Sequence, residues 1–250
     1  MTAVRPMATA PNTIRGRPDT RQPTPDPSAA RFDGDRRILS DVNADDTELL
    51  DVLDDAGLPT GTTKARDLVH RDGDWHRAFH LWVVQPDGYV LLQRRSKAKD
   101  LAGGLVDVSV AGHVRAGETL LDVLREAEEE IGLSVRPGDV AFLETIRSER
   151  RYPDGRVDRE HQDVYAVVSR GRGLREYHLR CDEVAVLYEA PIARAVELFR
   201  DGTPLAVAGW DCQRRPNDAL LVTDDLIPQA RSATAASLER LASWWASVTA

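Results

Sequence analysis

The stretch Gly112–Leu133, GHVRAGETLLDVLREAEEEIGL, carries the densest pattern in the 250-residue chain. Its part Thr119–Ile131 repeats apolar residues at helical spacing with acidic residues opposite, which predicts an amphipathic helix. Glu126, Glu129 and Glu130 stand at i, i+3 and i+4, so their carboxylates project from one face. Three anions this close repel one another unless a cation lies among them, and oxygen ligands suit Mg²⁺ or Mn²⁺. The pattern predicts a divalent metal site, although a solvated acidic helix face would also explain the run.

Fixed residues around these glutamates match a known signature. The stretch resembles the signature of the Nudix hydrolase family, Gly-x5-Glu-x7-Arg-Glu-U-x-Glu-Glu-x-Gly-U, in which U is apolar. The matching residues are Gly112, Glu118, Arg125, Glu126, Ala127, Glu129, Glu130, Gly132 and Leu133. Only six residues separate Glu118 from Arg125, and a deletion inside a helix rotates the residues beyond it by about 100°. The contact expected between Glu118 and Arg125 therefore depends on whether the entry loop absorbs the deletion.

Glycines mark the turns of this motif. Gly112 and Gly117 let the chain turn tightly into the helix, and Gly132 would end the helix in a left-handed cap.

The resemblance implies an α/β fold, the Nudix α/β/α sandwich with a mixed β-sheet, here extended by an N-terminal β-hairpin and a C-terminal helical extension. It implies that Glu126, Glu129, Glu130 and the main-chain carbonyl of Ala111 hold Mg²⁺ or Mn²⁺. The implied reaction is hydrolysis of a diphosphate linkage in a small phosphorylated molecule, a nucleotide or nucleoside-diphosphate compound. One of the glutamates, or Glu160, would take the proton of the attacking water.

A wider match, over roughly residues 45–200, is similar to the Nudix subgroup related to isopentenyl-diphosphate isomerase. These isomerases bind a metal through histidines and glutamates and use a cysteine just before a Gly-His pair. Candidate equivalents of the ligands are His70, His76, His113 and Glu160, and Ala111 takes the place of the cysteine. Since alanine has no proton to exchange, hydrolysis is favoured over isomerisation. An isomerase-like enzyme and a non-catalytic ligand-binding module remain the alternatives, and the histidines could equally be core residues.

Further substrate contacts are expected from basic residues. Arg94 and Arg95 end a predicted strand and could fork onto a phosphate, with one of the two facing solvent because successive strand residues alternate. His113, beside Gly112, is a third candidate for substrate binding.

Composition divides the chain into three parts. Residues 1–38 are rich in proline and poor in large apolar residues, which predicts a disordered tail. Residues 39–204 form the expected Nudix domain and residues 205–250 the helical extension, whose apolar face (Leu238, Leu241, Trp244, Trp245, Val248) suits core packing or a homodimer. Within the domain the pattern predicts a hairpin over 48–63, a helix over 64–69, a half-buried strand at Leu105–Val110, and a helix over 192–199.

Charge and cysteine content exclude several functions. The net charge of −8 disfavours binding to a nucleic acid polymer, and no apolar run approaches the length of a membrane span. Cys181 and Cys212 show no metal-binding spacing and are expected to be free thiols in a cytoplasmic protein.

Overall fold

The computed structural model describes residues 48–171 and 173–250, and the predicted tail, residues 1–38, lies outside them. The strands are β1 (Leu49–Leu53), β2 (Pro59–Ala65), β3 (Trp75–Val84), β4 (Tyr89–Arg95), β5 (Val106–Asp107), β6 (Val110–His113), β7 (Val140–Arg151), β8 (Val157–Val168), β9 (Val184–Pro191), β10 (Leu205–Asp211) and β11 (Ala219–Leu221). The helices are α1 (Arg66–Asp72), α2 (Leu120–Val123), α3 (Arg125–Ile131), α4 (Ile192–Asp201) and α5 (Arg231–Thr249).

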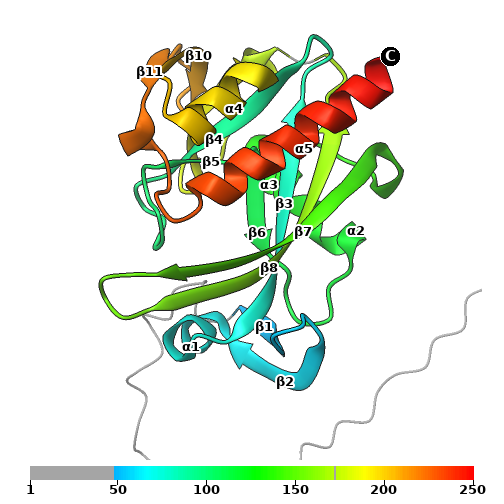
Figure 1. Ribbon diagram of the computed structural model, residues 1–250, viewed down its shortest axis with the longest axis vertical. Helices are drawn as coiled ribbons and strands as arrows, with labels where there is room; N and C mark the ends of the chain where they lie inside the picture. The colour runs from blue at the N-terminus through cyan, green and yellow to red at the C-terminus, as the bar shows by residue number, and fades with distance from the viewer. Residues whose placement is uncertain (1–47, 172) are drawn as a thin grey trace, which may run out of the picture. The chain divides into compact units, whose positions relative to one another are not determined.

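A mixed sheet runs through the described part of the chain (Figure 1). Its main path is β11-β10-β9-β4-β3-β1-β2, with β1 and β2 forming the predicted N-terminal hairpin. β8 pairs in parallel with β3 along the whole length of β3, and β6 pairs with β3 in antiparallel. β7 and β8 form a long hairpin. β3 therefore brings together segments that are far apart in the sequence.

The side chains of β3 alternate between two hydrophobic cores, as the period of a strand requires. Leu81 and Val83 belong to the core that includes the apolar face of α3. Trp82 and Val84 belong to the core under α4 and α5, where Trp82 Nε1 donates a hydrogen bond to Ser237 Oγ at 2.9 Å. Helices cover both faces of the sheet, so the predicted α/β/α sandwich is confirmed (Figure 1). Among the described residues, none of the helices has the length and apolarity that crossing a membrane requires.

One prediction about local structure is wrong and another is incomplete. Leu105–Val110, expected to be a half-buried strand, is divided between β5 and β6, and Val106–Val110 are all buried because packed elements cover both sides. Residues 205–250, expected to be a helical extension, contain β10 and β11 as well as α5. These two strands extend the sheet beside β9 and contribute Leu205, Val207 and Leu221 to the core.

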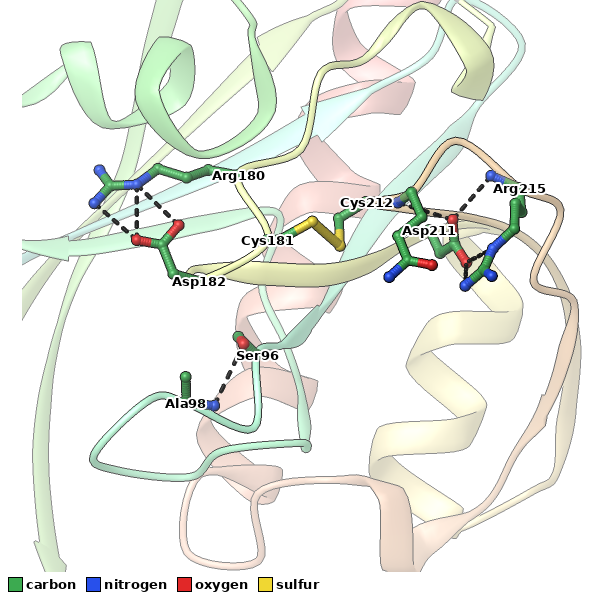
Figure 2. The surroundings of a disulfide bond; sticks show 9 residues. Ser96, Ala98, Arg180, Cys181, Asp182, Asp211, Cys212 and Arg215 are labelled. Atoms are coloured by element: carbon green, nitrogen blue, oxygen red, sulfur yellow. Dashed lines mark hydrogen bonds and ion pairs between the residues drawn. A yellow bond between two sulfur atoms is a disulfide. The ribbon is translucent and has the colours of Figure 1, made fainter.

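The expectation of two free thiols is also wrong, because Cys181 and Cys212 form a disulfide (Figure 2). Their Cα atoms lie 5.2 Å apart although the residues are 31 positions apart in the sequence. The antiparallel pairing of β9 with β10 places the residue after β10 beside the segment that leads into β9. Because the sequence analysis did not predict β10, it could not predict that Cys181 and Cys212 lie close together.

The apolar face of α5 mainly serves the core. Leu238 and Leu241 are fully buried, and Trp244 and Trp245 pack against the same core while partly exposed. Val248 is exposed. A homodimer through this helix stays a prediction.

Candidate active site

A pocket of about 210 Å³ gathers most of the predicted site residues. Glu126, Glu129 and Glu130 line it together with His113 and Glu160. Cationic side chains, among them Arg95, Lys99 and Arg180, line the same pocket, as do Ala111 and Gly112. Carboxylates and cations therefore face one small volume, an arrangement suited to a metal ion and an anionic ligand bound together.

The helix that carries the motif is divided at Leu124. The predicted helix Thr119–Ile131 is interrupted there, so that α2 ends at Val123 and α3 begins at Arg125. The Arg125 guanidinium consequently reaches back to Glu118, with 2.6 Å between Nη1 and Oε1. The contact that the resemblance implies is thus present in spite of the six-residue gap.

Arg125 also arranges two of the three proposed metal ligands. Its Nη2 donates to Glu126 Oε1 at 2.9 Å, and its Nε lies 3.5 Å from Glu129 Oε1. Gly112 allows Glu126 to approach, because a Cβ at Gly112 would lie 3.1 Å from Glu126 Cγ. Burial raises the pKa of Glu126, and the neighbouring Glu129 adds to the effect while Arg125 opposes it.

Glu130 is the most buried of the three carboxylates, with an exposed fraction of 5%. Its Oε2 has no hydrogen-bond partner among the described residues. Burial raises the pKa of this carboxyl to about 8, although Lys99 and Arg95 act in the opposite direction. A buried carboxylate oxygen that faces a pocket without a partner is suited to ligate a cation, so these residues fit a divalent metal ion.

A second group of ligands lies beside the glutamates. His70, His76, His113 and Asp158 each offer one ligand atom, and these four atoms lie within 4.8 Å of one another. Among the described residues, His70 Nε2, His76 Nε2 and Asp158 Oδ1 are buried without a hydrogen-bond partner. Imidazole nitrogens with a carboxylate oxygen form a donor set typical of divalent transition metals. His80 lines the pocket but lies outside this group.

The topology of the sheet explains how this histidine cluster forms. His70 lies in the last turn of α1 and His76 is the second residue of β3, whereas His113 ends β6. The pairing of β3 with β6 sets Ala78 opposite His113, and the parallel pairing with β8 sets His76 opposite Glu160. Residues on four elements therefore meet at one end of β3.

Burial and neighbouring charges divide the histidines into two kinds. Burial lowers the pKa of His70 to about 2 and that of His76 to about 4, so both are neutral and able to ligate at pH 7. Burial acts in the same direction on His113, but hydrogen bonding to Glu160 and Glu48 outweighs it and raises the pKa of His113 to about 9.

Glu160 is not a surface acid. It is buried, its carboxylate contacts the Arg150 guanidinium, and His113 Nε2 lies 3.6 Å from its Oε1. Burial opposes ionisation, yet Arg150 and His113 together hold the pKa of Glu160 well below its ordinary value. Arg150 Nη2 also lies 2.9 Å from Asp158 Oδ2. The sequence analysis did not identify Asp158 as a site residue, although the Asp158-x-Glu160 spacing places two acids on one face of a strand.

The structure separates Arg94 from Arg95. Arg95 lines the pocket, and its Nη1 lies 3.3 Å from Asp107 Oδ2. Arg94 points to the other face, where it donates to Tyr188 Oη at 3.0 Å and to Asp225 Oδ1 at 2.8 Å. The predicted alternation holds, but Arg94 is half-buried in protein contacts instead of facing solvent. Its predicted role in substrate binding is therefore corrected, because its donors are already engaged outside the pocket.

Comparisons with known proteins identify the family of this chain. Residues 74–189 match the NUDIX domain family. An uncharacterized Nudix hydrolase of Clostridium acetobutylicum is 32% identical over 189 residues, which cover 72% of this chain and 90% of that protein. An isopentenyl-diphosphate Delta-isomerase of Escherichia coli is 30% identical over 172 residues, which cover 68% of this chain and 91% of the isomerase. The solved structure of DR0079 from Deinococcus radiodurans has a TM-score of 0.47 and 21% identity, covering 62% of this chain and 90% of that one.

The chain therefore belongs to the Nudix family of enzymes, and it is related to the isopentenyl-diphosphate isomerases within that family. Both resemblances seen in the sequence are confirmed.

Proposed function

We propose that the chain hydrolyses a diphosphate linkage in a small nucleotide-like molecule with the help of Mg²⁺ or Mn²⁺. The observation that carries this proposal is the shared pocket, in which Glu126, Glu129 and Glu130 face the cations of Arg95 and Lys99. The glutamates, with the main-chain carbonyl of Ala111, would hold the metal. When bound, such a metal lowers the pKa of a water ligand and neutralises charge on the phosphate oxygens.

Other side chains of the pocket would bind the phosphate, position the glutamates and accept the proton of the attacking water. Arg95 and Lys99 would bind the phosphate oxygens, since a guanidinium and an ammonium both donate hydrogen bonds to such oxygens. Arg125 would keep Glu126 and Glu129 in place through its contacts to both. Glu129 is the best placed general base, because its side chain is 42% exposed and its Arg125 contact is long. Glu160 suits that role less well, since Arg150 and His113 already occupy its carboxylate.

A matched pair of variants tests this proposal. Glu129→Gln should lower kcat by about 10²–10⁴-fold on a panel of nucleoside triphosphates, nucleoside-diphosphate sugars and dinucleoside polyphosphates with Mg²⁺ or Mn²⁺. Glu128→Gln should leave kcat unchanged, because Glu128 is exposed and does not line the pocket. Full activity of Glu129→Gln, or no metal-dependent phosphate release by the wild type, would refute the mechanism.

The histidine cluster favours one alternative, an isomerase-like enzyme that acts on prenyl diphosphates. The observation behind it is the group His70, His76, His113 and Asp158, which could hold a transition metal beside the pocket. Ala111 argues against it, because a methyl group cannot donate or accept a proton. Allylic isomerisation of isopentenyl diphosphate by the wild-type protein would support this alternative, and its absence beside metal-dependent hydrolysis would exclude it.

A small phosphorylated substrate, a cytoplasmic location and the absence of nucleic acid partners belong to the same proposal. The net charge of −8 supports the last of these, since a polyanion would be repelled.

A further inference from the structure

The Cys181–Cys212 disulfide joins a fixed point of the sheet to an irregular segment (Figure 2). Cys212 directly follows β10, and its N–H donates to the carbonyl of Ala185 on β9 at 3.0 Å. Cys181 lies in the irregular segment 177–183, which leads into β9. The disulfide therefore anchors this segment to a position that the sheet already holds.

The segment around Cys181 forms part of the pocket wall. Arg180 and Glu183, on either side of Cys181, both line the pocket. The Arg180 N–H donates to the carbonyl of Glu130 at 3.0 Å, and the Glu183 carboxylate pairs with the ammonium of Lys99. The position of segment 177–183 is thus linked to a proposed metal ligand and to a proposed phosphate contact.

The disulfide is open to exchange, because Cys181 is exposed and Cys212 is only partly buried. A thiolate of a dithiol reductant can attack Sγ of Cys181, form a mixed disulfide and release Cys212 as a thiolate that takes up a proton. The second thiol of the reductant then displaces Cys181. The products are two cysteine thiols and the reductant oxidised to its own disulfide, so electrons and protons balance.

We propose that Cys181–Cys212 is a reversible redox site that sets how tightly the pocket binds the diphosphate group of its substrate. The inference rests on the diphosphate binding of the proposed function. With the disulfide formed, the backbone of Arg180 is held against Glu130 in α3, and Glu183 is held beside Lys99. The Arg180 guanidinium is paired with Asp182 of the same segment, so it moves together with that segment. Reduction leaves hydrogen bonds and ion pairs to hold the segment, so Arg180 moves away from the pocket wall more often and affinity falls.

Binding of inorganic pyrophosphate with Mg²⁺, measured by titration calorimetry, tests this proposal. We expect Kd to be at least fivefold higher for the reduced wild type than for the oxidised wild type. Cys212→Ser should have the Kd of the reduced protein whether or not reductant is present. Arg180→Gln should remove the difference between the two redox states, whereas Arg170→Gln, at an exposed arginine paired with Asp139, should retain it. Equal Kd values in the two states, or no pyrophosphate binding in either, would overturn the inference.

Two further readouts separate this inference from protein folding and from catalysis. Hydrogen exchange on the wild type, which avoids any folding defect of a variant, should be faster at the Arg180 amide after reduction and unchanged in the middle of β9. Equal exchange at Arg180 in both states would overturn the inference. Redox-dependent binding without phosphate release would refute the hydrolysis alone, whereas normal turnover with redox-independent binding would refute the redox site alone.

Discussion

Replacing Glu130 with glutamine should make the metal-free protein more stable at alkaline pH and weaken its binding of Mg²⁺ or Mn²⁺. Glu130 is buried and its Oε2 lacks a hydrogen-bond partner among the described residues. Ionising it without a cation places an unpaired charge in the interior. Glutamine has nearly the same shape and carries no charge, so it removes this cost together with the metal ligand.

The magnitude is set by the pKa of Glu130. Burial raises this pKa from 4.5 to about 8, so the folded protein keeps a proton there that the unfolded chain releases at lower pH. The free energy of unfolding is therefore unaffected by Glu130 below pH 4.5. It falls as the pH rises from 4.5 through about 8 and then levels off. The loss amounts to roughly 3–5 kcal/mol by pH 9. His113, whose pKa is raised to about 9, also loses its contribution as the pH rises from 6.5 through 9, but it does so in both proteins.

Urea unfolding at pH 5, 7 and 9, with all metal removed by a chelator, measures the effect. Between pH 5 and pH 9, the wild type should lose roughly 3–5 kcal/mol more than Glu130→Gln, and Glu128→Gln, at an exposed position, should follow the wild type. The same pH dependence in wild type and Glu130→Gln would refute the description of Glu130 as a buried, protonated acid.

Three further substitutions or treatments probe the surroundings of the pocket. Arg150→Met leaves the buried carboxylates of Asp158 and Glu160 without their cation. In metal-free urea unfolding it should lower the free energy of unfolding by roughly 3–5 kcal/mol, and Mn²⁺ should restore part of this loss. A loss below about 1 kcal/mol would contradict the ion pairs. Gly132→Ala, at φ 69° with its new Cβ 3.0 Å from His178 Cβ, should cost about 1–3 kcal/mol, and an unchanged Tm would argue against this packing. Reducing the Cys181–Cys212 disulfide, whose cysteines are 31 positions apart, should lower the free energy of unfolding by about 3–4 kcal/mol. The urea midpoint should therefore be lower with a dithiol reductant than without it, and equal midpoints would contradict this expectation.

The helix face that carries the glutamates could be predicted because its signal is local, and the sandwich could be predicted from the family resemblance. The period of a helix alone places Glu126, Glu129 and Glu130 on one face, and the structure puts all three on the pocket. The division of this helix at Leu124 could not be predicted, since nothing in residues 119–124 breaks the helical pattern.

The histidine cluster and the disulfide show where sequence reasoning stops. The histidines were candidates, but Asp158 joins them only through the parallel register of β3 with β8, which pairs residues about 80 positions apart. Cys212 meets Cys181 only because β10 lies beside β9. The alternation of Arg94 and Arg95 was predictable, but choosing the one that faces the pocket requires knowing which helix covers which face.

The interruption at Leu124 also changes how the motif should be read. This chain keeps a 2.6 Å contact between Arg125 and Glu118 although one residue fewer lies between them than in the signature. A pattern written with a fixed gap would therefore miss this chain, although Glu126, Glu129 and Glu130 all line the pocket. The spacing in a motif stands for a distance between side chains, and in this chain the distance is kept while the spacing is not.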